Sequence, residues 1–258
     1  MSYNQTMVTI KTPSQIAGIK KSCRLAAQTL QYTASFLKPG ISTEFLNQKA
    51  HQYILNHSAI PAPLNYNGFP KSICTSVNHV VCHGIPSPNH FLKEGDIINL
   101  DVTTILNGFY GDTSATFGIG KISPQAQKLI EVTKKSLDMA INKIKPGRYL
   151  NEVVGKTIED YVSSFNFSPV RDLGGHGIGL KFHEAPFVFH FDTPQNRIPL
   201  RPGMIFTVEP MINASPNWQV FIDQQDGWTV FTQDNSLSAQ FEHTVLVTPR
   251  GHEVLTKI

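Results

Sequence analysis

Cysteine, long apolar runs and long runs of one charge are all scarce in this sequence. The three cysteines, Cys23, Cys74 and Cys82, show no CxxC spacing, which argues against a disulfide framework and against a zinc knuckle. No run approaches the roughly 18 apolar residues of a membrane span. The first ten residues also lack the basic region and apolar stretch of a signal peptide. We therefore expect a cytoplasmic protein with no membrane partner.

The basic residues are dispersed along the chain. The net charge is +3, and adjacent lysines occur only as the pairs Lys20-Lys21 and Lys134-Lys135. A solvated helix surface explains such pairs better than a nucleic-acid patch, because no long basic run or stacking aromatic motif accompanies them. The 258 residues, 40% of them hydrophobic, are enough for one globular α/β unit with a sizeable core.

Cap residues followed by proline predict two long helices, which begin at Thr12-Pro13 and Ser123-Pro124. Each helix ends at a Lys-Pro-Gly sequence, and a second helix follows each of them. The expected elements are helices at about 12–36, 42–57, 123–144 and 150–165, an apolar strand at about 73–82, and a hairpin after it.

Three matches in all relate the two parts of the chain. The Lys-Pro-Gly sequences lie at 38–40 and 145–147, GDIINLD (95–101) resembles GMIFTVE (203–209), and HGIP (83–86) resembles HEAP (183–186). Any one match is compatible with coincidence. Together they favour an internal duplication within a single domain, 1–258, made of similar halves at about 12–120 and 123–258.

The stretch INLDVTTILNGFYGDTSATF (98–117) predicts a β-hairpin that turns at Asn107-Gly108. In this register Thr103 lies opposite Asp112, and Asp101 is on the same face, about 7 Å from Asp112. Two carboxylates at this spacing in a dry site repel each other, so one must take up a proton or a cation must lie between them. A pair of divalent ions about 3.5–4 Å apart fits the spacing.

Two other acids interrupt apolar strands, Glu209 in GMIFTVEP and Glu242 in SAQFEHTVLV, and His176 lies in GGHGIG. We expect these glycines to let the backbone approach a ligand. Each residue also has an ordinary explanation, because a strand carboxylate is more often an edge, salt-bridge or cap residue and a lone histidine is more often structural. If the ordinary explanations all held, each of the four carboxylates in these apolar strands would need its own exposure to solvent. One shared metal site explains all of them together, so we favour it.

These five residues reproduce, in type and order, the ligand set of the methionine aminopeptidases. The strings NLDVT, GFYGDTSATF, GGHGIG, FTVEPM and SAQFEHT resemble the type I members, and the resemblance covers nearly the whole chain. It implies the duplicated α/β (α+β) "pita-bread" fold, with pseudo-twofold halves, an antiparallel sheet core and outer helices. Glu242 follows Glu209 too closely for the helical insertion of type II enzymes, and helices that begin by residue 12 leave no room for the zinc-binding extension of eukaryotic cytosolic forms. A compact, bacterial-like type I enzyme is therefore expected.

By this resemblance, Asp101 holds one ion, His176 and Glu209 hold the other, and Asp112 and Glu242 bridge both. The resemblance implies that a water or hydroxide between the ions attacks the first peptide bond and releases an initiator methionine that precedes a small residue. It also gives Glu209 a part in proton transfer. An oxygen-rich site with one imidazole suits Co, Mn, Fe or Zn.

The resemblance also assigns residues around the metals. His83 and His183 match two non-ligand histidines that orient the peptide and stabilise the oxyanion or the leaving amine, although each also fits a structural histidine beside a turn. Cys82 and His83 are neighbours in a predicted strand and should point to opposite faces, which argues against a thiol dyad. The methionine pocket would comprise Tyr66, Phe69, Cys74, Phe182 and Trp228, which are also ordinary core residue types. A monovalent cation would lie at Asn78, Val80 and Ser238. Pro63, Phe69 and Tyr110 depart from residues that are frequent in relatives.

Nascent polypeptide N-termini and the ribosome are the implied partners, and the protein is expected to be a monomer. Prolidases and proline-specific aminopeptidases, which share this metal set and usually carry a large N-terminal domain, are the first alternative. A non-enzymatic member of the fold is the second, although such members have lost ligands that are all present here.

Overall fold

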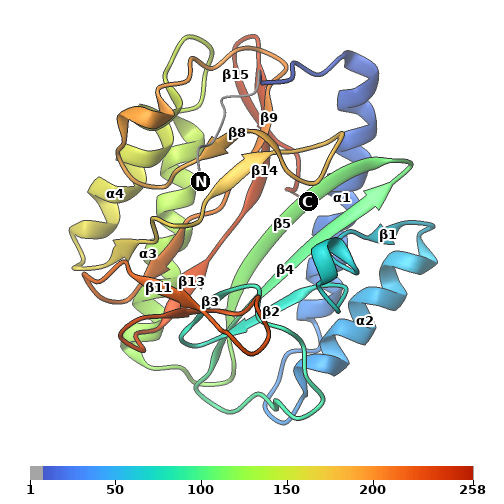
Figure 1. The fold of residues 1–258 in the computed structure, drawn as a ribbon, viewed down its shortest axis with the longest axis vertical. Helices are drawn as coiled ribbons and strands as arrows, with labels where there is room; N and C mark the ends of the chain where they lie inside the picture. Colours follow the sequence, from blue (N-terminus) through green and yellow to red (C-terminus); the bar gives the residue numbers. More distant parts are fainter. Residues whose placement is uncertain (1–7, 258) are drawn as a thin grey trace.

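The structure, a computed structural model, describes residues 8–257 (Figure 1). Its α-helices are α1 (Pro13–Ala34), α2 (Thr43–Asn56), α3 (Pro124–Asn142) and α4 (Lys156–Ser163). Short helical segments lie at Tyr66–Gly68, Asn151–Gly155 and Pro194–Asn196. None of the helices between residues 8 and 257 combines the length and the apolar character needed to cross a membrane.

Side-chain caps start the long helices where the sequence predicted. The Thr12 hydroxyl accepts a hydrogen bond from the Gln15 N–H, and the Gln15 side chain accepts one from the Thr12 N–H, which makes a capping box. The hydroxyls of Ser42 and Ser123 accept hydrogen bonds from the N–H groups of Phe45 and Ala126 and so cap α2 and α3. The expected helix at 150–165 is present as the wide-turn segment Asn151–Gly155 followed by α4.

All strand pairs in the described residues are antiparallel and form four sheets. The first sheet comprises β1 (Ile60–Pro61), β4 (Ile97–Leu106) and β2 (Cys74–Val77), with β5 (Phe109–Gly118) paired to β4. The second runs β15 (Gly251–Val254), β14 (His243–Thr248), β9 (Ile205–Val208), β7 (Gly175–Gly177), β8 (Glu184–Val188). The smaller sheets run β13 (Ser238–Gln240), β10 (Met211–Asn213), β6 (Ser168–Pro169) and β11 (Val220–Ile222), β12 (Val230–Thr232), β3 (Val80–Cys82).

The helices flank the strands as two pairs, α1 with α2 on one side and α3 with α4 on the other (Figure 1). One buried cluster joins α1 and α2 to β4 through residues such as Leu46, Ile98 and Leu100. A second joins α3 and α4 to β9 and β14 through residues such as Phe206 and Val245. Burial of these apolar faces is the main stabilising term for each layer. The polar faces of the central strands are left to form the site.

The hairpin has the predicted register and turn. Thr103 pairs with Asp112, and Leu106 pairs with Phe109 across the turn. Both turn residues have positive φ, 51° at Asn107 and 80° at Gly108, as a type I′ turn requires. The turn chemistry therefore fixes which residues face each other along both arms.

The predicted apolar strand at about 73–82 is wrong as a single element. The structure has β2 and β3 there, separated by a turn at Asn78 and His79. Asn78 has a positive φ of 56°, a conformation that asparagine tolerates better than β-branched residues do. The turn sends β3 into the sheet of β11 and β12, which carries Cys82 toward the cavity described below.

The two Lys-Pro-Gly sequences make parallel contacts. Gly40 and Gly147 have φ values of 85° and 82°. Their N–H groups donate to the carbonyls of Leu92 and Leu200, at 2.7 and 3.0 Å. These parallels support the duplication of halves 12–120 and 123–258, which remains a prediction.

We expect Gly111→Ala to destabilise the junction between α1 and β5. A Cβ at this position would lie 2.3 Å from the backbone nitrogen of Cys23 in α1, so the helix would have to move. Overpacking of this kind costs about 1–3 kcal/mol of unfolding free energy. Gly251→Ala is the control, because no atom lies within 4 Å of the added Cβ, and it should change stability by less than about 0.5 kcal/mol. Denaturant unfolding measures both, and equal midpoints would contradict the prediction.

Candidate metal centre

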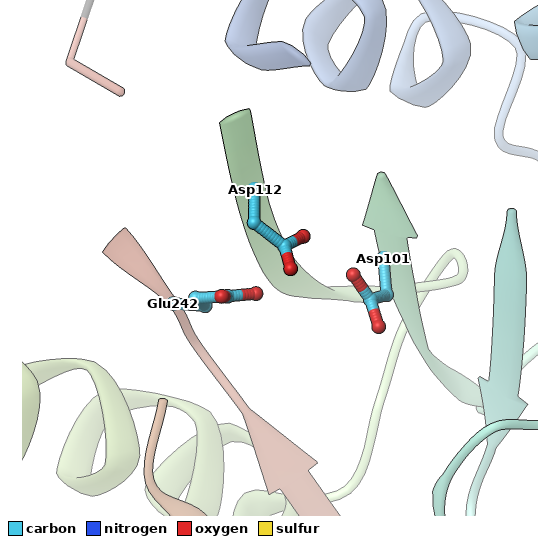
Figure 2. Close-up of side chains that lie close together, drawn as sticks. All are labelled: Asp101, Asp112 and Glu242. Atoms are coloured by element: carbon cyan, nitrogen blue, oxygen red, sulfur yellow. The ribbon is translucent and has the colours of Figure 1, made fainter. Parts of the chain in front are cut away.

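Three carboxylates converge at the centre of the molecule. Asp101 of β4, Asp112 of β5 and Glu242, between β13 and β14, each offer an oxygen within 4.8 Å of the other two. Figure 2 shows the three side chains pointing toward one another from these separate segments. Asp112 and Glu242 are only 4% and 2% exposed, so solvent does not separate their charges.

Alternation along β4 directs Asp101 into the site. Ile98, Leu100 and Val102 pack in the cluster with α1 and α2. Asp101 and Thr103 therefore face the opposite side of the strand. The Thr103 hydroxyl donates to Asp112 Oδ1 at 2.7 Å, which anchors one carboxylate by its cross-strand neighbour.

Hydrogen bonds join β5 to the segment that carries Glu242. The Glu242 N–H donates to the Ser114 carbonyl at 2.9 Å, and the Thr113 hydroxyl donates to the Glu242 carbonyl at 2.8 Å. The Thr244 hydroxyl donates to the Asp112 carbonyl at 2.8 Å. These bonds hold segments that are far apart in the sequence against each other, and they bring Glu242 to the aspartates.

His176 of β7 and Glu209, which follows β9, complete the group. His176 Nε2 lies 3.8 Å from Asp112 Oδ2 and 3.8 Å from Glu209 Oε1. His176 Nδ1 lies 3.0 Å from the Gly177 carbonyl, which can only accept, so Nδ1 carries the proton of the neutral ring. The Nε2 lone pair therefore faces the carboxylates. The structure thus brings together all five residues that the sequence singled out.

The glycines around His176 serve a different purpose from the one expected. A Cβ at Gly175 would lie 2.5 Å from the Thr207 carbonyl oxygen, and one at Gly177 would lie 2.2 Å from the Ala185 carbonyl oxygen. Their small size allows β7 to fit between β8 and β9, so the nearest atoms belong to neighbouring strands. The expectation that they admit a ligand is wrong for these two positions.

Burial shifts the pKa of every group in the cluster. Burial raises the pKa of Asp101 to about 7 and that of Glu209 to about 8. Burial and neighbouring carboxylates raise the pKa values of Asp112 and Glu242 well above their ordinary range. Burial lowers the pKa of His176 to about 4. Without a cation, the carboxyl groups therefore retain protons toward neutral pH, whereas the imidazole is neutral.

Some residues that support the site were missed by the sequence analysis. The Thr207 hydroxyl donates to Glu209 Oε1 at 2.6 Å, and the Gln240 amide donates to Glu209 Oε2 at 3.1 Å. The Glu209 N–H donates to Nε2 of the fully buried His190 at 3.1 Å. Period-two alternation from Glu209 would have found Thr207. No local signal identifies Gln240 or His190, because tertiary structure brings them there.

A cavity of about 370 Å³ has the acids in its wall. It is also lined by every predicted pocket residue: Tyr66, Phe69, Cys74, Phe182 and Trp228. His83 and His183 line it too. The Phe69 and Trp228 rings meet edge to face, with centroids 5.3 Å apart. Burial raises the pKa of Cys74 well above its ordinary value, so it presents a neutral, polarizable thiol.

His183 hydrogen-bonds Tyr66 through Nδ1, at 2.9 Å from the phenol oxygen, and its ring centroid lies 4.2 Å from that of His176. Burial lowers the pKa of His83, and burial with two neighbouring imidazoles lowers that of His183. Both rings are therefore neutral at pH 7. Neutral imidazoles keep one donor and one acceptor each, as groups that orient a peptide need.

Cys82 and His83 both line the cavity, so the argument that they point to opposite faces is wrong. β3 ends at Cys82, and His83 has a φ of 56°, which breaks the strand alternation. Burial raises the pKa of Cys82 well above its usual value, so the thiol remains protonated and is not an activated nucleophile.

The predicted monovalent-cation residues lie on neighbouring segments. The Ser238 N–H donates to the Asn78 carbonyl at 2.9 Å, and Val80 pairs with Phe231 in β12. Pro63 lines the cavity, and Tyr110 stacks on Phe182 with centroids 6.0 Å apart. Pro63 and Phe69 thus both belong to the cavity wall.

Known proteins resemble this chain over almost all of its length. The model of metallopeptidase family M24 matches residues 17–249. A methionine aminopeptidase of Buchnera aphidicola subsp. Acyrthosiphon pisum is 52% identical over 248 residues, covering 96% of this chain and 93% of that protein. The Escherichia coli K12 methionine aminopeptidase is 47% identical over 250 residues, covering 96% and 94%.

Solved structures extend the likeness to the fold. The crystal structure of methionine aminopeptidase from Rickettsia prowazekii superimposes with a TM-score of 0.94 at 47% identity, covering 97% of this chain and 100% of that one. The Thermotoga maritima enzyme gives 0.94 at 37% identity, covering 98% and 100%. A Pyrococcus furiosus prolidase gives 0.75 at 21% identity, covering 98% of this chain and 67% of that one, which shows the fold alone. These likenesses confirm the expected pita-bread fold.

The metal-free protein should lose stability as the pH rises above about 6.5. Folded Asp101 and Glu209 retain protons up to about pH 7 and 8, whereas the unfolded groups release them near pH 4. Below about pH 6.5 the buried histidines oppose this effect, because His176, with a folded pKa of about 4, takes up its proton only on unfolding. Above that pH the histidines are neutral in both states and the folded state binds more protons, so the free energy of unfolding falls between about pH 6.5 and 8, by up to about 1.4 kcal/mol per pH unit for each group.

Denaturant unfolding of chelator-treated protein at about pH 6.5 and 8 measures this slope. Glu242→Gln should flatten it, whereas Glu253→Gln, in an exposed ion pair, should leave it unchanged. Added Mn²⁺ should stabilise the wild type more at pH 8 than at pH 6.5, because ligands bind a cation in their deprotonated form. A wild-type slope equal to that of Glu242→Gln would contradict the pKa assignments.

Proposed function

The chain belongs to metallopeptidase family M24, among the compact methionine aminopeptidases, and we propose that its converging donors and adjoining cavity remove the initiator methionine from chains with a small second residue. As a member of this family it is a metal-dependent hydrolase that acts on polypeptide N-termini. One observation carries the proposal: a single cavity is lined both by four carboxylates with an imidazole and by polarizable apolar groups.

The donor set suits divalent ions. Glu242 Oε1 is buried with no hydrogen-bond partner among the described residues, and such an oxygen is costly unless a cation reaches it. Four carboxylates supply four negative charges, which two divalent ions neutralise. When bound, the ions would polarise the scissile carbonyl and make water a competent nucleophile at neutral pH.

We assign Asp101 to one ion and His176 with Glu209 to the other, while Asp112 and Glu242 serve both. The position of Asp112, between Asp101 on its sheet and His176 across the site, supports a bridging role. The ions would be drawn from Co, Mn, Fe and Zn, which such mixed oxygen and nitrogen sites accept. A monovalent cation at Asn78, Val80 and Ser238 is a further proposal, supported by the contact between Asn78 and Ser238.

Glu209 is proposed to accept the proton that the attacking water loses and to pass it to the leaving amine. Donors at both of its oxygens, Thr207 and Gln240, fix the orientation of this carboxylate. The same two hydrogen bonds favour its ionised form, so Glu209 can act as a base once cations compensate for its burial.

His183 and His83 are proposed to orient the peptide and to stabilise the developing oxyanion or the leaving amine. The Tyr66 hydroxyl lies 2.9 Å from Nδ1 of His183, and we propose that it donates there. This direction places the proton of the neutral ring on Nε2, which can then donate to a substrate oxygen. His83 contacts Trp228, with ring centroids 6.0 Å apart, and so lies against the wall of the methionine pocket.

The pocket is proposed to select methionine by polarizability and shape. Phe69, Trp228 and the Cys74 thiol surround the cavity with groups that make favourable contacts with a thioether. Pro63 and Phe69 would adjust its shape. We further propose that the enzyme is a cytoplasmic monomer that meets nascent N-termini near the ribosome and recognises no nucleic-acid sequence.

Peptide cleavage tests the function. We expect the metal-loaded enzyme to release methionine from a Met-Ala-Ser peptide and to leave X-Pro dipeptides intact. A prolidase would instead cleave the X-Pro dipeptides. Chelation should lower the rate at least about 100-fold, because Lewis-acid stabilisation is worth several kcal/mol, and Mn²⁺ or Co²⁺ should restore it. Preferential X-Pro cleavage would indicate the prolidase alternative. A purified protein that binds no metal and cleaves neither peptide would indicate a non-enzymatic member.

Asp112→Asn and His183→Ala should fail in different ways. Asp112→Asn removes a bridging ligand, so it should lose bound metal together with activity while the protein remains folded. His183→Ala should lower kcat by roughly 10²–10³-fold at unchanged metal content, as the loss of an oxyanion donor does. Metal analysis and kinetics on the same samples separate the two. Equal loss of metal and turnover in His183→Ala would reassign that residue as a ligand.

A further inference from the structure

An ion pair outside the metal centre links the start of the described chain to the loop that carries His183. Lys11 Nζ contacts Glu184 Oε2, and the exposed fractions of the two side chains are 1% and 8%. Every other Lys or Arg pair with a carboxylate in the described residues leaves at least one side chain more than 20% exposed. Lys11 lies outside the cavity and has no place in the proposed chemistry.

The second carboxylate oxygen of Glu184 binds the backbone of the loop that carries His183. Oε1 accepts from the N–H groups of Leu180 and Lys181, at 2.7 and 2.9 Å. Phe182 and His183, which both line the cavity, lie in the sequence between these two donors and Glu184 itself. The Glu184 side chain thus closes a tight turn of backbone around the two rings.

Lys11 is itself held firmly. Its N–H donates to the Gly203 carbonyl at 2.9 Å, and the residue lies next to Thr12, which caps α1. Its aliphatic stem passes near Gly179, where an added Cβ would lie 3.5 Å from Lys11 Cε. The Gly179 carbonyl also accepts from the Tyr110 N–H at 3.0 Å. The ammonium group therefore sits at a fixed point between α1, the hairpin and the loop.

We propose that Lys11 is a positioning residue for His183, acting through Glu184. Among the described residues, the His183 side chain hydrogen-bonds only with Tyr66, which lies on a short surface segment. The orientation of the ring therefore depends largely on the backbone that carries it. Removal of one partner of a buried ion pair leaves the other charge uncompensated. Without Lys11, Glu184 would keep only the two N–H donors at Oε1, and the loop would shift to expose the carboxylate to solvent. The catalytic consequence rests on the proposed role of His183.

Three variants test this inference. Lys11→Met removes the charge and keeps the stem, Lys11→Arg keeps the charge, and Glu184→Gln keeps an oxygen for the two N–H donors. Lys20→Met is the matched control, because Lys20 of α1 makes an exposed pair with Glu253. The measurements are kcat and KM for Met-Ala-Ser, bound metal, and the ¹H–¹³C signal of the His183 ring in metal-free protein, assigned with His183→Ala.

We expect Lys11→Met to lower kcat about tenfold or more and to raise KM less, since small misplacements of a catalytic group are costly. Its metal content should equal that of the wild type, and its His183 signal should move. Lys11→Arg should recover most of the loss, and Lys20→Met should remain within about twofold of the wild type. Adding Glu184→Gln to Lys11→Met should cost nothing further, because both changes break the same pair.

A folded Lys11→Met with wild-type kcat and an unmoved His183 signal would overturn the inference, as would a fall in kcat matched by equal loss of metal. If Lys11→Met does not fold, Glu184→Gln decides by the same measurements. A wild type that releases no methionine would refute the proposed function, and the His183 signal in metal-free protein would still decide whether Lys11 positions the loop.

Discussion

Repulsion among four carboxyl groups that the fold forces into one buried space is the constraint on which this structure depends. Asp112 and Glu242 are almost inaccessible to solvent, and Asp101 lies within 4.8 Å of both. Without cations the protein must keep protons on these groups, and their raised pKa values express that cost. A pair of divalent ions would compensate these charges and would make the same arrangement a reaction centre.

The surrounding structure supports this centre with hydroxyl and amide groups. Thr103, Thr207 and Gln240 each donate to a carboxylate, which limits its rotation without adding charge. Thr113 and Thr244 donate to backbone carbonyls across the junction of β5 with the Glu242 segment. The helices bury only the outer faces of the sheets, so the inner faces can remain polar. Outside the centre, the buried Lys11 ammonium group compensates the charge of Glu184, whose carboxylate holds the loop of His183.

Local chemistry made some elements predictable from the sequence. Asn107-Gly108 set the register of the hairpin, and that register alone placed Asp101 and Asp112 on one face. Thr12 and Ser123 predicted two helix starts, because a hydroxyl at the cap position satisfies N–H groups that the helix leaves free. The division of the strand at 73–82 was not predicted, since the positive φ of Asn78 shows no distinct signal within an apolar run. The closely packed glycines beside His176 were misread for a related reason, because their partners lie on other strands.

The amino-acid sequence by itself therefore singled out the five residues that the structure brings together, the hairpin that holds two of them, and the polarizable residue types that line the cavity. These properties depend on residue type and on neighbours within a few positions, which the chain carries whatever its global shape. Tertiary structure alone decided that Glu242 reaches Asp112, that Gln240 and His190 support Glu209, and that Lys11 pairs with Glu184. Those contacts join residues as many as 173 positions apart, and only the packing of both layers around one centre brings such partners within bonding distance.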